Sequence, residues 1–330
     1  MRRAPALLST LAVAAVVVTS LVGCSSGSSS SAAACPSIYA SGAASSIVTA
    51  TGSTNAAPTV TFPTPLVSTD NQVSIVKPGS GAPIQEGEQV DYKVSVYSGK
   101  TGALLGNVGY GSSATPIRSG AVTELSGKTA TAVMQSLVCA TTGERYVLTS
   151  TAKDAFGAGA LTSNNVSDSD SLVVVVDVAD HFLGKADGFN LLPQDGLPSV
   201  VTAVNGQPGL VIQELAMPTS LRIETVKGGS GAVVKDKQTV HMKYSGWIWP
   251  ATGSKLDVPW DDSSWTKDQA VDVPVNSSLP TGLYKALLGA KVGSQILAVI
   301  PPKDGFPSGT VSSIPDGSTI VMVIDVLGIK

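Results

Sequence analysis

The sequence predicts an α+β fold that is built twice along the chain, each copy an antiparallel sheet curled around one short helix. The first observation is an internal repeat: residues 79 to 97 align with 229 to 247, and 137 to 156 align with 287 to 306, at an offset of 150. The second is the strand pattern, in which stretches alternate apolar and polar residues or are rich in valine. The third is that each copy contains one short helical stretch.

The first 34 residues are expected to be a targeting segment rather than part of the fold. Arg2 and Arg3 precede an uncharged, apolar stretch, which ends in the sequence Leu-Val-Gly-Cys at Cys24. This ending resembles a bacterial lipoprotein cleavage site, which implies that residues 1 to 23 are removed and Cys24 is acylated. Residues 24 to 34, rich in Ser, Gly and Ala, would then be a flexible tether. An uncleaved anchor helix and ordinary secretion are the alternatives.

Two cysteines remain if Cys24 carries lipid, namely Cys35 and Cys139. An exported protein can hold a disulfide, and Cys35 lies where the patterned sequence begins. We therefore expect a bridge that ties the N-terminal arm to the first copy. Two unrelated free thiols are the alternative.

The two copies are expected at residues 35 to 185 and 199 to 330, joined by a linker at 186 to 198 that is rich in Gly, Pro and Asp. Each copy opens with a hairpin-like arm, and the two arms resemble each other weakly. The closing strands, 172 to 178 and 320 to 326, align at an offset of 148.

The helical stretches are expected around residues 131 to 139 and 281 to 289. Leu283 and Leu287 are four residues apart, so they would face the core together. Val133 and Leu137 have the same spacing in the first copy.

In the second copy, Val240, Met242 and Tyr244 alternate with His241, Lys243 and Ser245, which predicts a strand with Tyr244 on its apolar face. An Asp-Ser-Ser-Trp turn follows at 262 to 265. A short helix with an Ala-Leu-x-Gly-x-x-Val-Gly end comes next, then a strand ending in Ile-Pro-Pro, a loop with Ile-Pro, and the closing strand. These motifs in this order resemble the FKBP-type peptidyl-prolyl isomerases over roughly a hundred residues. The resemblance implies two FKBP-like domains, of which the second has the better-kept prolyl pocket.

The resemblance also implies the residues of that pocket. Tyr244, Asp262 and Phe306 match the polar and aromatic catalytic positions, although Phe306 stands where the family usually has tyrosine. The substrate pocket would consist of six further residues, with aliphatic side chains or methionine replacing several family aromatics: Val271, Leu279, Pro280, Leu283, Ile314 and Met322. Proline has no N–H, so Pro280 removes a backbone donor that the family uses.

A plainer interpretation stands beside each assignment. Tyr244 could be a core tyrosine, Asp262 a turn residue, and Phe306 and Met322 ordinary core residues. The four tryptophans between 247 and 265 could cover the barrel mouth or form an exposed binding patch. The first copy has Val94 and Val133 at the tyrosine and tryptophan positions, so we expect it to be inactive.

Composition excludes other classes of function. The net charge of −3 and the isoelectric point near 5.4 argue against nucleic-acid binding. The two histidines, His181 and His241, lack metal-ligand spacing, and no phosphate-binding glycine loop occurs, so neither metal nor cofactor is expected. The expected function is prolyl cis–trans isomerisation that assists exported, proline-containing polypeptides at the outer face of the cell membrane, through the lipid anchor. The alternative is a degenerate, non-catalytic module that binds extended or proline-containing segments.

Overall fold

The computed structural model describes residues 35, 37–111, 117–119, 131–211, 215–249, 263–267, 269–308 and 310–330. Residues 35–330 form one compact unit. We call residues 35–185 its first half and 186–330 its second half. The expected signal peptide, tether and Cys24 lie outside the described residues.

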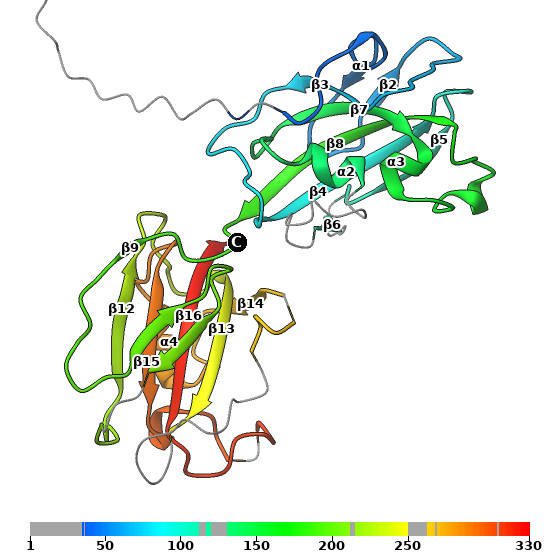
Figure 1. The fold of residues 1–330 in the computed structure, drawn as a ribbon. Helices are drawn as coiled ribbons and strands as arrows, with labels where there is room; N and C mark the ends of the chain where they lie inside the picture. Colours follow the sequence, from blue (N-terminus) through cyan, green and yellow to red (C-terminus); the bar gives the residue numbers. More distant parts are fainter. Residues whose placement is uncertain are drawn as a thin grey trace, which may run out of the picture. The chain divides into compact units, whose positions relative to one another are not determined.

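The first half contains an antiparallel six-stranded sheet (Figure 1). Its strand order is β3 (Gln72–Lys77), β7 (Arg145–Thr151), β8 (Ser171–Phe182), β4 (Gln89–Ser98) and β5 (Leu104–Val108), with β6 (Ile117–Arg118) also paired to β4. The two long strands β4 and β8 pair from Gln89 with Phe182 to Ser98 with Leu172. Valine is the commonest residue of both strands, because β-branched side chains pack well on a pleated surface.

The second half repeats this arrangement. Its sheet has the order β14 (Val271–Pro274), β13 (Thr239–Ile248), β16 (Ile320–Ile329), β15 (Gln295–Ile300), β12 (Arg222–Gly228) and β9 (Phe189–Asn190). The four strands β12, β15, β16 and β13 correspond to β3, β7, β8 and β4, as the internal repeat predicts. Strand β9 lies within the expected linker, where it forms a short pair with β12.

Short helices differ more between the halves than expected. The predicted helices are present as α2 (Ala132–Ser136) and α4 (Thr281–Leu287). However, the first half also has α1 (Ala43–Ser46) and α3 (Ala152–Phe156), so the prediction of one helix per copy is wrong there. Helix α3 begins because the Thr151 side chain accepts a hydrogen bond from the N–H of Asp154, a typical N-cap. The corresponding residues of the second half form only a 3₁₀ turn, at Pro302–Asp304.

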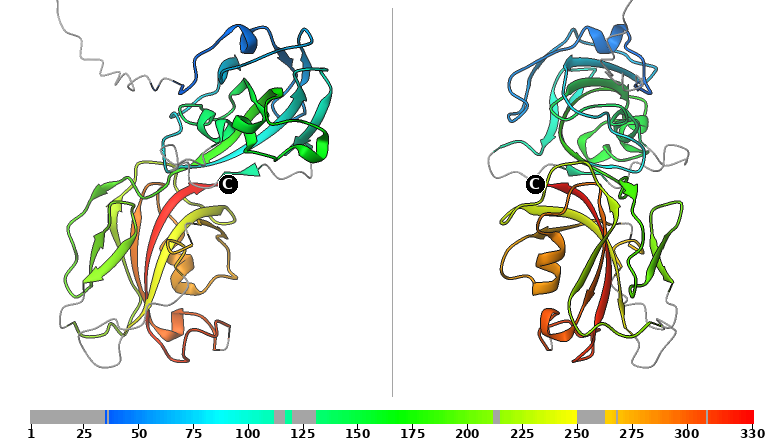
Figure 2. Two further views of the ribbon diagram at one scale, coloured as in Figure 1. Left: turned by 45° about the vertical axis from the view of Figure 1, so that its right-hand side comes forward. Right: turned by 90° about the vertical axis from the view of Figure 1, so that its left-hand side faces the viewer.

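Each main sheet packs on both of its faces. One face packs against a helix: Leu283 and Leu287 of α4, and likewise Val133 and Leu137 of the α2 segment, are buried as their spacing predicts. The other face is covered by a two-stranded hairpin. The hairpins are β1 (Thr49–Thr51) with β2 (Thr59–Thr61), and β10 (Ser199–Thr202) with β11 (Pro208–Val211). Figure 2 shows α4 and the β10–β11 hairpin on opposite faces of the second sheet.

The N-terminal arm of the first half is held in two ways. Cys35 and Cys139 form a disulfide, with their Cα atoms 5.3 Å apart. Arg145, fully buried beside Asp177, also donates hydrogen bonds to main-chain carbonyls of the β1–β2 hairpin turn. In the part of the chain that the structure describes, no helix is long and apolar enough to cross a membrane.

Candidate functional site

Tyr244 lies in the middle of β13, where it pairs with Ile324 of β16. As the alternation predicts, Tyr244 shares the inner, helix-facing side of the sheet with Met242 and Val240. Lys243 and His241 point to the other face, and His241 Nδ1 donates a hydrogen bond to Asp272 Oδ1 of β14 at 2.6 Å. His241 is therefore directed away from Tyr244 and is not part of the same site.

The turn that follows Asp262 is attached to the main chain of Tyr244. The Tyr244 N–H donates to the Ser264 hydroxyl at 2.8 Å, and the Ser264 N–H donates to the Tyr244 carbonyl at 3.1 Å. The Ser263 hydroxyl adds a bond to the same carbonyl at 3.2 Å and lies 2.9 Å from the Ser245 hydroxyl. Asp262 itself lies outside the described residues, but its neighbour Ser263 is fixed next to Tyr244.

The described pocket residues come together in one apolar cluster between α4 and the sheet. Leu283 and Met322 are buried in it, with 6% and 2% of their surface exposed, whereas the others are partly buried and pack against it. The cluster contains every pocket residue expected from the sequence except Asp262 and Pro280: Tyr244, Val271, Leu279, Leu283, Phe306, Ile314 and Met322.

The loop between β15 and β16 contributes two of these residues. Phe306 and Ile314 line a cavity of about 120 Å³, together with Pro302, Val311 and Ile320. The 3₁₀ turn at Pro302–Asp304 carries the chain away from β15, and Gly305 follows it before Phe306. Phe306 and Ile314, both in this one loop, thus form part of the wall of the cavity.

Helix α4 begins at the position where the family's backbone donor was expected. Pro280 is the N-cap residue, with φ −50° and ψ 136°, and its carbonyl accepts from the N–H of Tyr284 at 2.9 Å. The N–H of Leu279 donates to the carbonyl of Asn276 at 3.1 Å. Pro280 therefore has no N–H for a ligand, and that of Leu279 is already used.

The first half fills the equivalent space with its own side chains. Val94 and Val133 are buried at the positions of Tyr244 and Leu283. Tyr92 and Tyr146 occupy the positions of Met242 and Ile296, and the Tyr146 hydroxyl lies 2.9 Å from that of Ser136. Burial raises the pKa of Tyr146 far above its usual value, so this hydroxyl stays neutral. The core of the first half is thus filled by large rings.

The described tryptophans do not form an exposed patch, so that alternative is wrong for them. Trp249 and Trp265 are buried, with 6% and 8% exposed, and Trp247 packs beside Trp249 on the outer face of the sheet. The Lys243 ammonium lies 4.5 Å from the centre of the Trp265 ring. The indole rings of Trp247 and Trp249 thus pack against the outer face of the sheet. Trp260 lies outside the described residues.

Comparison with known proteins gives a family match in the second half, over the part of the chain that contains this cluster. Residues 231–327 match the family model of the FKBP-type peptidyl-prolyl cis-trans isomerases. A stretch of 112 residues is 30% identical to the FKBP-type peptidyl-prolyl cis-trans isomerase FkpA of Escherichia coli K12, covering 34% of this chain and 38% of that relative. FkpA of E. coli O157:H7 matches with the same values. The chain thus spans less than half the length of these curated relatives.

Two solved structures are also similar. The crystal structure of FkpA from E. coli matches at 25% identity and a TM-score of 0.29, covering 42% of this chain and 53% of that one. The three FKBP domains of wheat FKBP73 match at 15% identity and a TM-score of 0.30, covering 79% and 94%. Because these TM-scores are low, the assignment to a family depends on the sequence matches.

Proposed function

Since residues 231–327 belong to the FKBP-type peptidyl-prolyl cis-trans isomerase family, we propose that the second half catalyses prolyl cis–trans isomerisation in the cluster around Tyr244. The supporting observation is the gathering of Tyr244, Phe306, Ile314 and Met322 in one apolar cluster. The first half, with Val94 in place of the tyrosine, would not take part in catalysis.

The chemistry requires neither a nucleophile nor a metal. Rotation about a peptide bond has a barrier of about 18–20 kcal/mol because resonance keeps the amide planar. An apolar pocket favours the twisted amide, whose charge is less delocalised, over the planar amide that water solvates well. Polar groups at the pocket rim then orient the peptide on either side of the proline.

Each of the proposed residues has a distinct part in this scheme. The Tyr244 hydroxyl would donate a hydrogen bond to a substrate carbonyl, while Phe306, Ile314 and Met322 would enclose the proline ring. Asp262 would orient the bound peptide from the turn that Ser263 and Ser264 hold against Tyr244. The apolar walls come from strands, helix and loop, so they would be preorganised before substrate arrives.

A second candidate function is binding of proline-containing segments without catalysis. The specific observation that favours it is Pro280, which leaves the start of α4 without the backbone donor expected in the family. Leu283 at the pocket floor is also smaller and conformationally more flexible than the tryptophan ring that the family has there. Such a pocket would hold a segment less firmly in the twisted geometry.

We further propose that the protein is a lipoprotein of the extracytoplasmic membrane face, anchored through Cys24, with exported polypeptides as its clients. The cleavage-site pattern and the tether support this, and the Cys35–Cys139 disulfide suits an oxidising compartment. Cys24→Ser should leave unprocessed precursor and abolish metabolic labelling with a fatty acid. Unchanged labelling would rule out this anchor.

The isomerase proposal is tested by exchange NMR on a proline-containing tetrapeptide with the full chain. Tyr244→Phe combined with Asp262→Ala should lower the exchange rate tenfold or more, because it removes the orienting polar groups but keeps the apolar walls. Tyr284→Phe is the matched control, since the Tyr284 hydroxyl donates a hydrogen bond to Asp236 Oδ1 at the surface, at 3.2 Å. Activity that survives the double substitution would refute the site. Saturable peptide binding without exchange by the parent protein would support the second candidate.

A further inference from the structure

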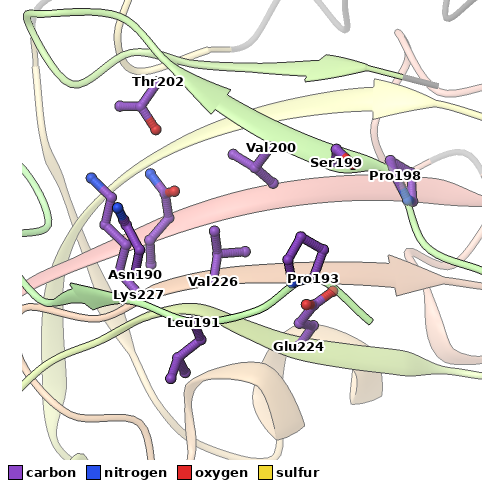
Figure 3. A pocket seen from close by; sticks show the side chains of 11 residues that line it. Asn190, Leu191, Pro193, Pro198, Ser199, Val200, Thr202, Glu224, Val226 and Lys227 are labelled. Carbon is purple, nitrogen blue, oxygen red and sulfur yellow. The ribbon is translucent and has the colours of Figure 1, made fainter. Parts of the chain in front are cut away.

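A pocket of about 350 Å³ lies on the outer face of the second sheet, beneath the β10–β11 hairpin. We call it the hairpin pocket. Figure 3 shows Val200 and Thr202 of the hairpin above Val226 of β12, with Lys227 toward one end and Glu224 toward the other. Tyr244 belongs to the cluster on the opposite face, so the hairpin pocket is separate from the proposed isomerase site.

The hairpin pocket contains a buried acceptor without a donor. Gln295 of β15 lines the pocket, is fully buried, and its Oε1 has no hydrogen-bond partner among the described residues. Its amide cannot simply be turned over, because Nε2 donates to Asp325 Oδ1 at 2.8 Å. Asp325 also accepts from the N–H of Ala186 at 2.8 Å. A flipped amide would place its oxygen against this carboxylate.

The first half shows which chemical group occupies the equivalent place. Arg145 of β7 pairs with Asp177 of β8, just as Gln295 of β15 pairs with Asp325 of β16. The Arg145 guanidinium donates to both oxygens of Asp177, from Nε at 2.7 Å and from Nη2 at 2.8 Å. The aspartate is thus kept in both halves, whereas the long cationic side chain is replaced by a shorter neutral one.

The remaining N–H groups of Arg145 bind the hairpin that covers them. They donate to the carbonyls of Thr51 at 3.2 Å, Gly52 at 2.9 Å and Ser53 at 3.0 Å. In the second half, Thr202 at the end of β10 precedes the turn of the covering hairpin and lines the hairpin pocket. The pocket therefore lies where the first half holds a guanidinium between its sheet and its hairpin.

A second difference between the halves adds an acceptor at the far end of the pocket. Glu224 occupies the position of Ser74, is 4% exposed, and accepts from the N–H of Gln194 at 2.8 Å. It pairs with Leu297, two residues along β15 from Gln295. The backbone positions of the two acceptors are therefore about 7 Å apart in the strand direction. Apolar side chains, including Val200 and Val226, line the middle.

Lys227 also lines the pocket but does not exclude a cation. Its counterpart Lys77 pairs directly with Arg145 in the first half, so a lysine here coexists with a guanidinium. The Lys227 ammonium donates to the carbonyl of Ala186 at 3.5 Å, and its charge lowers the pKa of Asp325, which burial raises. It is thus directed toward the Gln295–Asp325 pair.

We propose that the hairpin pocket binds an arginine, either as a free amino acid or as a residue of a polypeptide. The guanidinium would donate to Gln295 Oε1 and to the hairpin turn near Thr202, as the side chain of Arg145 does in the first half. The methylene groups would lie along Val200 and Val226. The nitrogen on the arginine Cα would donate to the buried carboxylate of Glu224, adding a donor to the one that the N–H of Gln194 supplies. The pocket is a binding site, and no covalent step is involved.

The test is calorimetric titration of the full chain with free L-arginine and with N-acetylarginine amide. Saturable binding of either is expected, and the tighter of the two identifies the free amino acid or the polypeptide residue as the better ligand. L-citrulline and its blocked form, which replace the guanidinium with a neutral urea, should bind at least tenfold more weakly. Equal binding of the citrulline compounds, or no saturable binding of arginine, would overturn the proposal.

Two variants locate the site. Gln295→Arg should fill the pocket with the guanidinium of the protein's own side chain and abolish binding of arginine. Circular dichroism of this variant tests whether the chain is folded. Glu224→Ser restores the residue of the first half and should weaken binding of free arginine at least tenfold. Asp195→Ser is the matched control, because Asp195 is an exposed carboxylate in the stretch between β9 and β10 and is not among the residues that line the pocket. Unchanged arginine affinity in Glu224→Ser would refute the site even if Gln295→Arg fails to fold.

Discussion

The N–H of Tyr244 donates a hydrogen bond to the Ser264 hydroxyl at 2.8 Å, and the same hydroxyl lies 3.2 Å from the Tyr244 carbonyl. This pairing joins the middle of β13 to a turn twenty residues later along the chain. Because Ser264 is 4% exposed, its hydroxyl contacts Tyr244 away from solvent. The turn is therefore joined to the main chain of the proposed catalytic tyrosine.

Ser264→Ala should both destabilise the protein and lower any isomerase activity. It leaves the Tyr244 N–H without a hydroxyl acceptor, which costs about 1–3 kcal/mol when a donor is buried. We expect urea unfolding to show that loss, with a parallel fall in exchange rate because the turn is released from Tyr244. Thr310→Ala removes an exposed hydroxyl that bonds to Pro307 and should change neither quantity. A stable Ser264→Ala variant with full activity would contradict this coupling.

Pro280→Ile should strengthen binding of ligands that present a carbonyl to the start of α4. The substitution adds an N–H at the N-cap, and the observed φ of −50° is accessible to isoleucine. A buried carbonyl that gains a donor is stabilised by about 1–3 kcal/mol, which corresponds to roughly 5-fold to 150-fold in affinity. Fluorescence titration with an FKBP-binding macrolide measures this. Pro218→Ile, in a loop before β12, is the control, and equal affinities in all three proteins would show that Pro280 is not at the ligand.

Arg145→Gln should strongly lower the free energy of unfolding, although it replaces one polar side chain with another. The change copies the residue of the second half, but it leaves Asp177 buried beside an uncharged partner and deprives the hairpin turn of its donors. Breaking one partner of a buried ion pair typically costs about 3–5 kcal/mol. Chemical denaturation should show a lowered midpoint, whereas Lys100→Gln at an exposed turn should not. A loss below about 1 kcal/mol would mean that the ion pair is not a stabilising element.

Much of the fold could be predicted from the sequence because the internal repeat reports on strands twice. The offset of 150 aligns β4 with β13 and β7 with β15, and period-two alternation places Tyr244 on the inner face correctly. Helix α3 was not predicted because the repeat does not report on it: the aligned residues of the second half form only a 3₁₀ turn, at Pro302–Asp304. Its one local signal is the Thr151 cap, and such a residue is equally common in turns.

The candidate site was predicted in part, for a related reason. Motif order identified Tyr244, Phe306 and Ile314, which the structure brings together from a strand and a loop. The hairpin pocket was missed because Gln295 and Glu224 have no motif of their own. The sequence signal for this pocket is that Gln295 replaces Arg145 at the equivalent position of the repeat. That replacement can be interpreted only once the structure shows that the Arg145 side chain donates to the hairpin.

The last prediction concerns pH. Burial raises the pKa of Glu88 from its usual value of 4.5 to about 7, although the N–H of Gln85 donates to its Oε2 at 3.0 Å and opposes the shift. Between these two values the folded state binds more protons than the unfolded state, so the free energy of unfolding falls as pH rises. This contribution to stability is complete below about pH 4.5 and is lost as the pH passes 7.

Glu88→Gln should therefore leave stability nearly unchanged at pH 5 and raise it at pH 8, flattening the melting temperature against pH. His181, whose pKa is lowered mainly by burial, acts in the opposite direction, and its Nε2 lies 3.9 Å from Glu88 Oε2. Glu88→Gln combined with His181→Gln, compared with His181→Gln alone, therefore isolates the contribution of Glu88. Glu86→Gln, at an exposed neighbour, is the control and should give a constant difference across this range. A Glu88→Gln variant that is destabilised equally at pH 5 and pH 8 would show that the carboxylate is ionised throughout and that its pKa is not raised.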